Sequence, residues 1–230
     1  MQVLGIVPAR GGSKAIPRKN IAQLNGRPLL AYTADAAKAS RRLTRTILST
    51  DDEAIADAGR QAGLEVPFMR PRDLSGDETP MLPVLQHALR TLAADGFAAD
   101  IVVLLQPTSP LRRAEHIDAA IDLLASTGAD SVVSVVEVPH QFNPASVMTV
   151  EGERLRPFGG DATVTRRQNK PRVLARNGPA VLAARASVIE AGSLYGDDTR
   201  PLLMTPRESL DIDEAWDLEI ASLLLAQATR

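Results

Sequence analysis

The sequence predicts an α/β fold with a mainly parallel central sheet, and three observations support this prediction. Short runs rich in Val, Ile and Leu alternate with segments of helical periodicity over the first 137 residues. The short runs are apolar throughout rather than alternating with polar residues, which is typical of strands that are buried on both faces. Hydrophobic residues make up 44% of the 230 residues, which is enough to form a core.

The expected elements follow one another as strand and helix along the chain. The strands are predicted at residues 3–8, 45–49, 66–69, 101–105 and 131–136. The helices between them are predicted at residues 28–39, 52–63, 80–94 and 114–127. Thr50 and Glu53 are three residues apart at the start of the second helix, which indicates a capping box. On the fourth helix, Ile117, Ile121 and Leu124 share one apolar face.

The alternation is interrupted after residue 138 and resumes near residue 180. The intervening residues carry turn signals, a charged stretch and the basic cluster RRQNK at 166–170. We therefore expect a single domain over residues 1–230, with an inserted arm at about 139–178 that contains one or two short hairpins. Strands at 180–184 and 202–205 and a final helix at 213–228 complete the predicted pattern.

The composition excludes several classes of protein. Lys plus Arg is 26 and Asp plus Glu is 28, so the formal net charge of −2 gives no electrostatic basis for binding nucleic acid. Aromatic residues, at 3%, are too few for a single-strand stacking platform, and the absence of cysteine excludes disulfides, thiolate metal sites and a Cys nucleophile. No apolar run approaches the roughly 18 residues of a membrane span, and the N-terminus does not match a signal peptide. We expect a cytoplasmic protein with neither nucleic acid nor membrane as a partner.

The segment after the first predicted strand, PARGGSKAIPRKN at residues 8–20, combines two glycines, a serine and four cations. Glycines allow backbone N–H groups to surround an anion, and Arg and Lys add charge and direct hydrogen bonds. The segment matches neither GxxxxGK[ST] nor GxGxxG, so it indicates neither a P-loop NTPase nor a dinucleotide-binding protein. It predicts a cradle for a triphosphate, with a basic surface turn as the alternative.

The fourth predicted strand leads into LQPTSPLR at residues 105–112. Two prolines on this loop would hold its polar side chains in place for substrate contacts, although the same residues also suit an ordinary turn. The three histidines, His87, His116 and His140, are scattered along the chain, and we interpret them as packing or surface residues.

Two carboxylates near the C-terminus form a candidate metal site. Asp211 and Asp213 are two residues apart in an extended segment, so their side chains project to the same side. This spacing suits a hard divalent cation such as Mg²⁺, which proteins usually bind through one or two carboxylates together with substrate phosphates. The alternative for Asp213 is the N-cap of the final helix.

Seven segments, in order along essentially the whole chain, resemble the acylneuraminate cytidylyltransferase family, which comprises CMP-sialic acid synthetases and bacterial relatives that activate nonulosonic acids. The segments are PARGGSKAIPRKN, STDDEAIADAG, FMRPRDLSGDETP, LLQPTSPLR, RRQ, RNGPAVLAAR and SLDIDEAWDLEIA. The resemblance implies a three-layer αβα fold, nucleotide-diphospho-sugar-transferase-like and Rossmann-like, with a protruding dimerisation arm. It also implies that CMP is transferred from CTP to the anomeric hydroxyl of an acidic nonulosonic sugar for surface polysaccharide biosynthesis, with Mg²⁺ as cofactor and release of pyrophosphate.

The resemblance further implies roles for individual residues. As catalytic residues it indicates Arg10, Lys14 and Asp211. As nucleotide contacts it indicates Arg10, Ser13, Lys14, Lys19, Asn20, Arg70 and Thr79. As contacts to the sugar it indicates Gln106, Arg167, Gln168 and Tyr195, and as Mg²⁺ ligands Asp211 and Asp213. Because the family's arm often reaches the neighbouring subunit, the resemblance implies a homodimer with composite sites.

The chain departs from the family pattern at two places. Ala15 stands where many members have glycine, and Leu194 with Tyr195 is the nearest counterpart of an aromatic pair that some sialic-acid enzymes present to the sugar. The arm segment 139–144 resembles bacterial relatives that activate pseudaminic or legionaminic acids. Two alternatives stay open: a 3-deoxy-manno-octulosonate cytidylyltransferase, whose signature differs at the PRKN end, and a non-catalytic nucleotide-binding homologue.

Overall fold

A seven-stranded sheet forms the centre of the computed structural model, which describes residues 1–13, 15–158, 166, 168 and 170–228. The strands lie in the order β11-β6-β10-β5-β1-β4, and β9 pairs with β6. β1 is parallel to β4 and β5, and β6 is parallel to β11, whereas β9 and β10 run antiparallel to their neighbours. The predicted mainly parallel sheet is confirmed. Its strands are β1 (Val3–Pro8), β4 (Arg45–Ser49), β5 (Ile101–Leu104), β6 (Ser131–Glu137), β9 (Leu174–Arg176), β10 (Leu182–Arg185) and β11 (Thr199–Leu203).

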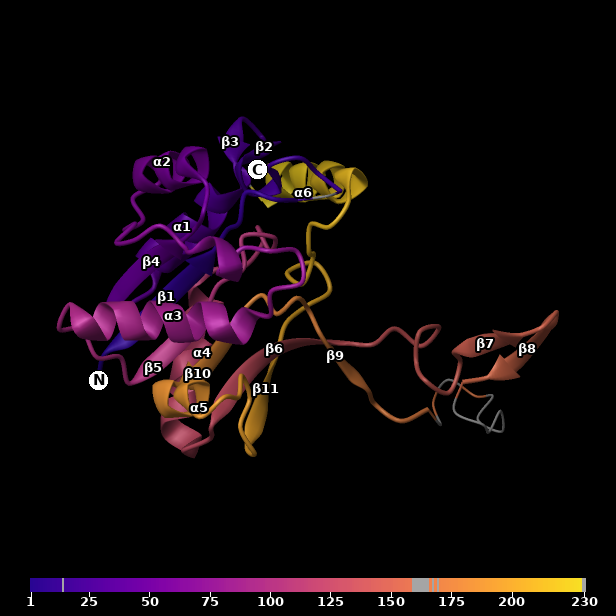
Figure 1. The fold of residues 1–230 in the computed structure, drawn as a ribbon. Helices are drawn as coiled ribbons and strands as arrows, with labels where there is room; N and C mark the ends of the chain where they lie inside the picture. The colour runs from indigo at the N-terminus through magenta and orange to yellow at the C-terminus, as the bar shows by residue number, and fades with distance from the viewer. Residues whose placement is uncertain (14, 159–165, 167, 169, 229–230) are drawn as a thin grey trace.

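Helices cover both faces of this sheet and give the three-layer arrangement (Figure 1). One face packs against α1, α2 and α4, and the other against α3 and α5. A third, smaller apolar cluster joins α6 to the short hairpin β2–β3. The helices are α1 (Leu29–Ala39), α2 (Glu53–Gln61), α3 (Met81–Ala94), α4 (Ala114–Thr127), α5 (Ala186–Glu190) and α6 (Ala215–Ala228), with 3₁₀ helices η1 (Lys19–Ile21) and η2 (Arg72–Leu74) and hairpin strands β2 (Gln23–Leu24) and β3 (Arg27–Pro28).

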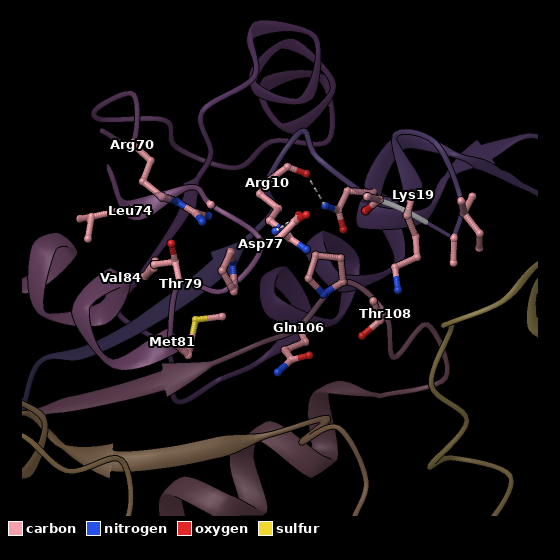
Figure 2. A pocket seen from close by; sticks show the side chains of 17 residues that line it. Arg10, Lys19, Arg70, Leu74, Asp77, Thr79, Met81, Val84, Gln106 and Thr108 are labelled. Atoms are coloured by element: carbon pink, nitrogen blue, oxygen red, sulfur yellow. Dashed lines mark hydrogen bonds and ion pairs between the residues drawn. The ribbon is translucent and has the colours of Figure 1, made fainter. Parts of the chain in front are cut away.

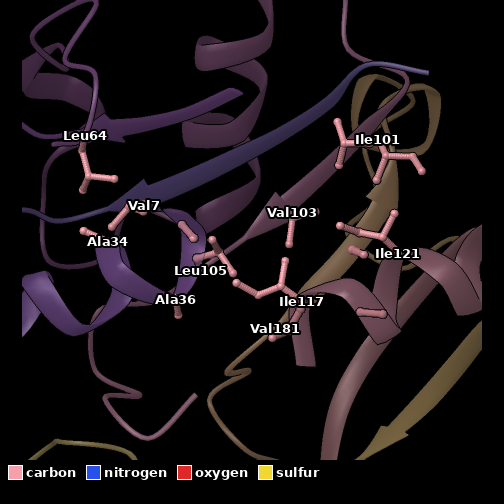
Figure 3. Close-up of a cluster of buried hydrophobic side chains, with 14 of the residues drawn as sticks. Val7, Ala34, Ala36, Leu64, Ile101, Val103, Leu105, Ile117, Ile121 and Val181 are labelled. Atoms are coloured by element: carbon pink, nitrogen blue, oxygen red, sulfur yellow. The ribbon is translucent and has the colours of Figure 1, made fainter. Parts of the chain in front are cut away.

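The continuous apolar runs of the central strands are explained by burial on both faces. Successive side chains of a strand point to opposite faces. Val103 therefore faces Ile117 of α4, and Val7 lies beside Ala34 of α1 on the same side of the sheet (Figure 3). Ile6 and Leu104 instead lie in the cluster formed with α3. Each of these side chains is at most 2% exposed, so neither face of β1 or β5 has a place for a polar residue.

Two local predictions were wrong, and both have a physical reason. Residues 66–69 do not form a strand: isolated bridges join Glu65 to Ile47 and Met69 to Thr50, and no ladder connects them, because Pro67 has no N–H to donate. The capping box is also absent. α2 begins at Glu53 with Asp52 as its N-cap, whose side chain accepts a hydrogen bond of 3.1 Å from Ile55 N, while Thr50 Oγ1 accepts one from Asp52 N. Elsewhere the predicted elements are present, with ends that shift by up to three residues.

In the described residues of the predicted arm there is one hairpin, formed by β7 (Met148–Glu151) and β8 (Arg154–Pro157). It projects well away from the sheet (Figure 1), and its residues are almost all exposed. The chain returns through β9, which pairs with the end of β6. Within the part of the chain that the structure describes, no helix is both long and apolar enough to cross a membrane.

The strand order creates a crevice at the carboxyl edge of the sheet. From β1 the chain crosses to β4 on one side, and it later returns to place β5 on the other side of β1. The segments that follow β1 and β5 therefore separate at this point, which is where open α/β sheets bind their ligands.

Candidate functional site

A cavity of about 290 Å³ lies at the carboxyl ends of β1 and β5 (Figure 2). Four segments that are distant in the sequence form its wall: the segment after β1, the stretch between residues 70 and 79, the start of α3, and the segment after β5. The lining residues are Pro8, Arg10, Ser13, Ala15, Ile16, Lys19, Asn20, Arg70, Leu74, Gly76, Asp77, Thr79, Met81, Val84, Gln106, Pro107 and Thr108.

The segment after β1 is held in place by carboxylates and by its own side chains. Arg10 Nη1 donates to Asp77 Oδ1 at 2.6 Å, and Asn20 Nδ2 donates to the carbonyl of Arg10 at 3.0 Å. Gly11 N donates to Asp51 Oδ1 at 3.0 Å. A Cβ on Gly11 would lie 2.9 Å from Asp52 Oδ2, so this position has no room for a side chain. These contacts curve the glycine-containing segment around one side of the cavity.

Lys19 joins this segment to the C-terminal carboxylates. It begins η1, after Arg18 in the left-handed backbone region with φ of 51°. Its Nζ donates to the carbonyl of Ile212 at 2.6 Å and to Asp213 Oδ1 at 3.2 Å. Because the Lys19 side chain is largely buried, this ion pair is less screened by solvent than a surface pair.

Arg70 is a buried cation at the other end of the cavity. Its Nε donates to Ser49 Oγ at 3.1 Å, and its Nη2 donates to the carbonyl of Ser49 at the end of β4. Burial lowers the pKa of Arg70 to about 10, while the carboxylate of Asp51 acts in the opposite direction, so the guanidinium remains charged at neutral pH. Thr79 lines the cavity beside it (Figure 2).

Gln106 lies where β5 ends. Its Nε2 donates to the carbonyl of Gly178 at 3.2 Å, which fixes the side-chain amide at the edge of the cavity. Its backbone carbonyl accepts a hydrogen bond of 2.9 Å from Nη1 of Arg112. Arg112 is only 3% exposed. Burial lowers the pKa of Arg112 to about 9, so this residue too remains a cation at neutral pH.

Asp211 is half-buried beside this edge of the cavity, and its Oδ1 is fully buried. Its Oδ1 makes no hydrogen bond of ordinary geometry within the described residues, and the same holds for Oγ1 of Thr108. Burial raises the pKa of Asp211, and the carboxylate of Asp213 adds to this effect, whereas the Thr108 hydroxyl and Lys19 oppose it. A buried carboxylate oxygen without a partner is a ready ligand for a cation.

The residues fit an Mg²⁺ ion that is bound jointly by the protein and a substrate, because they do not form a complete metal site by themselves. Among the described residues, no group of three or more His, Asp or Glu side chains is placed to hold a metal ion. Asp211 offers a free buried oxygen, and Asp213 is exposed, 3.2 Å from Lys19. Mg²⁺ typically keeps several waters and binds through one or two carboxylates plus substrate phosphates, which matches this incomplete set. Asp213 is not the N-cap, because α6 begins at Ala215 and Glu214 precedes it; Asp217 accepts the N–H groups of Asp213 and Glu214.

The segment that carries Asp211 has no regular secondary structure, and side chains from elsewhere hold it. Glu208 accepts from Arg113 Nη2 at 2.5 Å and from Thr205 Oγ1 at 2.8 Å. His116 Nε2 lies 3.5 Å from the same carboxylate, while its Nδ1 accepts from Arg113 N at 3.1 Å. A histidine that accepts at Nδ1 is neutral, so His116 contacts Glu208 as an uncharged ring.

The structure brings most of the sequence-predicted site residues together, but not all. Tyr195 lies apart from the cavity lining: it packs beside the cluster of α3 and α5, and Arg176 stacks 5.1 Å from its ring and donates to its hydroxyl. Gln168 is exposed on the arm, and Lys14 and Arg167 lie outside the described residues. Arg10, Ser13, Lys19, Asn20, Arg70, Thr79 and Gln106 share the cavity.

Sequence reasoning missed four residues of this region as individuals. Asp77, Thr108 and Arg112 lie in segments that were singled out, but nothing in their spacing showed what they contact. Asn177 lies in the segment RNGPAVLAAR, which the sequence analysis also quoted, but no role was predicted for it; its Nδ2 donates to Ser209 of residues 208–213, the acidic segment.

An open α/β sheet with a cationic cavity at its switch point, bordered by a carboxylate pair, defines a nucleotidyltransferase type of site. A family model described as cytidylyltransferase matches residues 4–178. The chain therefore belongs to the cytidylyltransferase family, and it is a nucleotidyltransferase.

Curated relatives match nearly the whole chain. The chain is 34% identical to CMP-N,N'-diacetyllegionaminic acid synthase of Legionella pneumophila, over 98% of this chain and 97% of that protein. It is 28% identical to pseudaminic acid cytidylyltransferase of Campylobacter jejuni, over 97% and 96%. The solved structure of a CMP:2-keto-3-deoxy-manno-octonic acid synthetase complexed with CTP superposes with a TM-score of 0.73 over 99% of this chain and all of that chain, at 18% identity, which shows the shared fold.

His116 gives the stability of the protein a defined pH dependence. Burial lowers its pKa below 6.5; Glu208 and Glu115 oppose this effect, and Arg113 and Arg112 add to it. The unfolded chain takes up a proton near pH 6.5 while the folded state does not. The free energy of unfolding is therefore unaffected by this group above pH 6.5 and falls as the pH drops toward the lowered pKa.

We expect His116→Gln to make this fall shallower in urea unfolding at a series of pH values. The slope that remains comes in part from His87, whose pKa is also lowered by burial. The exposed His140→Gln variant serves as the control and should follow the wild type. An unchanged slope in His116→Gln would contradict the assignment of a neutral, buried His116.

Proposed function

We propose that this protein transfers CMP from CTP to the anomeric hydroxyl of an acidic nonulosonic sugar and releases pyrophosphate. The observation that carries the proposal is the meeting of Arg10, Lys19 and Arg70 in one cavity that borders the segment with Asp211. The sugar class is supported by the curated relatives, whose names specify legionaminic, pseudaminic and N-acylneuraminic acids. We place the reaction in the cytoplasm, where CTP is available.

The cavity offers a different chemistry at each end (Figure 2). Arg70 and Thr79 lie at one end, where side-chain donors and a hydroxyl suit the cytidine. Arg10 occupies the middle, where its guanidinium suits the triphosphate. Gln106 and Thr108 lie at the other end, next to Asp211, and suit the hydroxyls of the sugar acid. CTP would therefore lie across the cavity with its α-phosphorus near Lys19 and the acidic segment.

In this arrangement the protein positions the reactants and neutralises charge. The oxygen of the anomeric hydroxyl attacks the α-phosphorus, its proton passes to a carboxylate of the acidic segment, and the bond from phosphorus to pyrophosphate breaks. Arg10 and Lys19, with Lys14 from the same segment, offset the negative charge of the phosphates. Gln106 orients the sugar, and Asp211 and Asp213 would hold Mg²⁺. When bound, this ion adds positive charge at the phosphate oxygens and at the departing pyrophosphate.

The arm supports a homodimer. Side chains on one face of the hairpin are Met148, Val150, Leu155 and Pro157, which pair across β7 and β8. The opposite face carries Thr149, Glu151, Arg154 and Arg156. Val150 and Leu155 are 73% and 65% exposed, so an apolar face stands in solvent on a projecting hairpin. We infer that a second copy of the chain covers this face, and that Arg167 and Gln168 of the arm reach the sugar of the neighbouring subunit.

The reaction is tested first by measuring pyrophosphate release with CTP and Mg²⁺ against a panel of acidic sugars. The panel contains N-acetylneuraminic, legionaminic, pseudaminic and 3-deoxy-manno-octulosonic acids, with ATP, GTP and UTP as controls. We expect turnover with CTP and a nine-carbon acid. Preference for the eight-carbon acid would establish the octulosonate alternative, and CTP binding without turnover on any acid would indicate a non-catalytic homologue.

The role of the acidic segment is tested by Asp211→Asn. The variant loses the anionic ligand while its size is kept, so we expect CTP to bind as in the wild type and Mg²⁺-dependent turnover to fall about 100-fold or more. The control is Asp122→Asn, which breaks an exposed 2.8 Å ion pair with Arg42 on the surface of α4. Unchanged pyrophosphate release by Asp211→Asn would refute the metal assignment.

The arm is tested by Val150→Lys, measured by light scattering after size exclusion. The added charge lies on the apolar face of the hairpin, so we expect a monomer with reduced turnover of the sugar acid. Thr149→Lys adds the same charge to the opposite face and should remain dimeric. A monomeric wild type, or a dimer that tolerates Val150→Lys, contradicts the proposed interface.

A further inference from the structure

The turn between β9 and β10 contains a fully bonded, buried amide. Asn177 is 6% exposed. Its Oδ1 accepts from Ser134 Oγ at 2.6 Å and from Ala180 N at 3.3 Å, and its Nδ2 donates to Ser209 Oγ at 2.8 Å and to Met204 Sδ at 3.4 Å. The backbone N–H of Ala180 requires an oxygen opposite it, which assigns the amide orientation. With each polar atom engaged twice, the side chain has one arrangement.

The bond to Ser209 reaches the acidic segment two residues before Asp211. On the other side of Asp211, Ile212 N donates to the carbonyl of Thr108 at 2.8 Å, and the Ile212 side chain is fully buried. Asp211 thus lies between two residues, Ser209 and Ile212, that are both held by hydrogen bonds. Its Oδ1 makes no hydrogen bond of ordinary geometry within the described residues, so the two anchored backbone positions, together with the nearby Thr108 hydroxyl, locate the carboxylate.

The next residue of the same turn, Gly178, contacts Gln106, the residue that we propose to bind the sugar acid. The carbonyl of Gly178 accepts from Gln106 Nε2 at 3.2 Å. Gly178 has φ of 118°, a conformation that disfavours any side chain, and a Cβ there would lie 3.4 Å from Asp211 Oδ2. The turn therefore lies next to the carboxylate of Asp211, and its Gly178 carbonyl holds the side chain of Gln106.

We propose that the Asn177–Gly178 turn is a positioning element that fixes Asp211 relative to Gln106, and that the Asn177–Ser209 hydrogen bond sets the affinity of the acidic segment for its divalent cation. Neither Asn177 nor Ser209 lines the cavity, so both act through Asp211. The inference rests on the proposed function, because it assumes that Asp211 and Gln106 act on the same reaction. In this proposal Asn177 supports the binding of the cation through Asp211, and Gly178 supports the orientation of the sugar through Gln106.

The test uses Ser209→Ala, which removes one hydroxyl from a half-buried position and leaves Asn177 in place. Mn²⁺ replaces Mg²⁺, and free Mn²⁺ is measured by electron paramagnetic resonance on the full-length protein with CTP present. Loss of a group that orients a metal ligand typically costs 10–100-fold in metal affinity, so we expect Mn²⁺ to bind about tenfold more weakly. CTP binding without metal, measured by calorimetry, should be unchanged. Ser209→Thr keeps the hydroxyl and should restore Mn²⁺ affinity.

Thr44→Ala is the matched control for a general loss of stability. Thr44 Oγ1 donates to the carbonyl of Val3 and accepts from Val3 N, at the opposite edge of the sheet from the cavity. We expect its melting temperature to fall while Mn²⁺ affinity stays at the wild-type value. If Ser209→Ala behaves in the same way, the hydrogen bond is merely structural and the proposal is overturned.

A second variant addresses the glycine. Gly178→Ala should weaken Mn²⁺ binding and also raise the KM for the sugar acid, because both Asp211 and Gln106 depend on this turn. An effect on neither quantity in a folded variant would overturn the proposal. A wild type without Mn²⁺-dependent turnover would refute the proposed function itself, whereas an active wild type with unaltered Ser209→Ala would refute only the role of the turn.

Discussion

The carboxyl edge of the sheet depends on the buried guanidinium of Arg112. Removing a charge from water costs on the order of several kcal/mol unless hydrogen bonds replace the solvent. Here Nη1 donates to the carbonyls of Gln106 and Ala180, at 2.9 and 3.0 Å, and Nη2 donates to the hydroxyl of Thr33. These bonds join the end of β5, the approach to β10 and α1. The cavity edge and the turn behind Asp211 therefore share one support.

Two cations of the cavity, Arg10 and Lys19, are already paired with carboxylates from other segments. Arg10 is bound to Asp77 and Lys19 to Asp213, so each cation has a fixed position before a triphosphate adds its own charge. Donors that are held in place in this way need little reorganisation when charge develops on a substrate, which is the main source of electrostatic stabilisation in phosphoryl and nucleotidyl transfer. The same pairs join the segment after β1 to two regions far along the chain.

The acidic segment shows how an irregular stretch can be as well determined as a helix. Glu208 is held from α4, Ser209 from the β9–β10 turn and Ile212 from the segment after β5 and from Lys19. Each contact involves a different part of the fold. The position of Asp211 therefore depends on the correct arrangement of all the segments at the carboxyl edge of the sheet. A scaffold of rigid strands that positions functional residues on irregular segments is the usual arrangement in α/β proteins.

The sequence by itself determined the class of fold and the glycine-rich cationic segment after β1, because strand burial, helical periodicity and glycine-with-cation composition are local properties. It did not determine that residues 66–69 make only an isolated bridge, from Met69 to Thr50, since the loss of one N–H at Pro67 outweighs an apolar pattern. Only the tertiary structure decided that Asp77 faces Arg10, that Tyr195 lies apart from the cavity and that Asn177 stands behind Asp211. The Arg10–Asp77 contact spans 67 positions and the Lys19–Ile212 contact spans 193, so no local pattern encodes either one. They arise because the crossing from β1 to β4 and the return to β5 bring separate segments to one edge of the sheet.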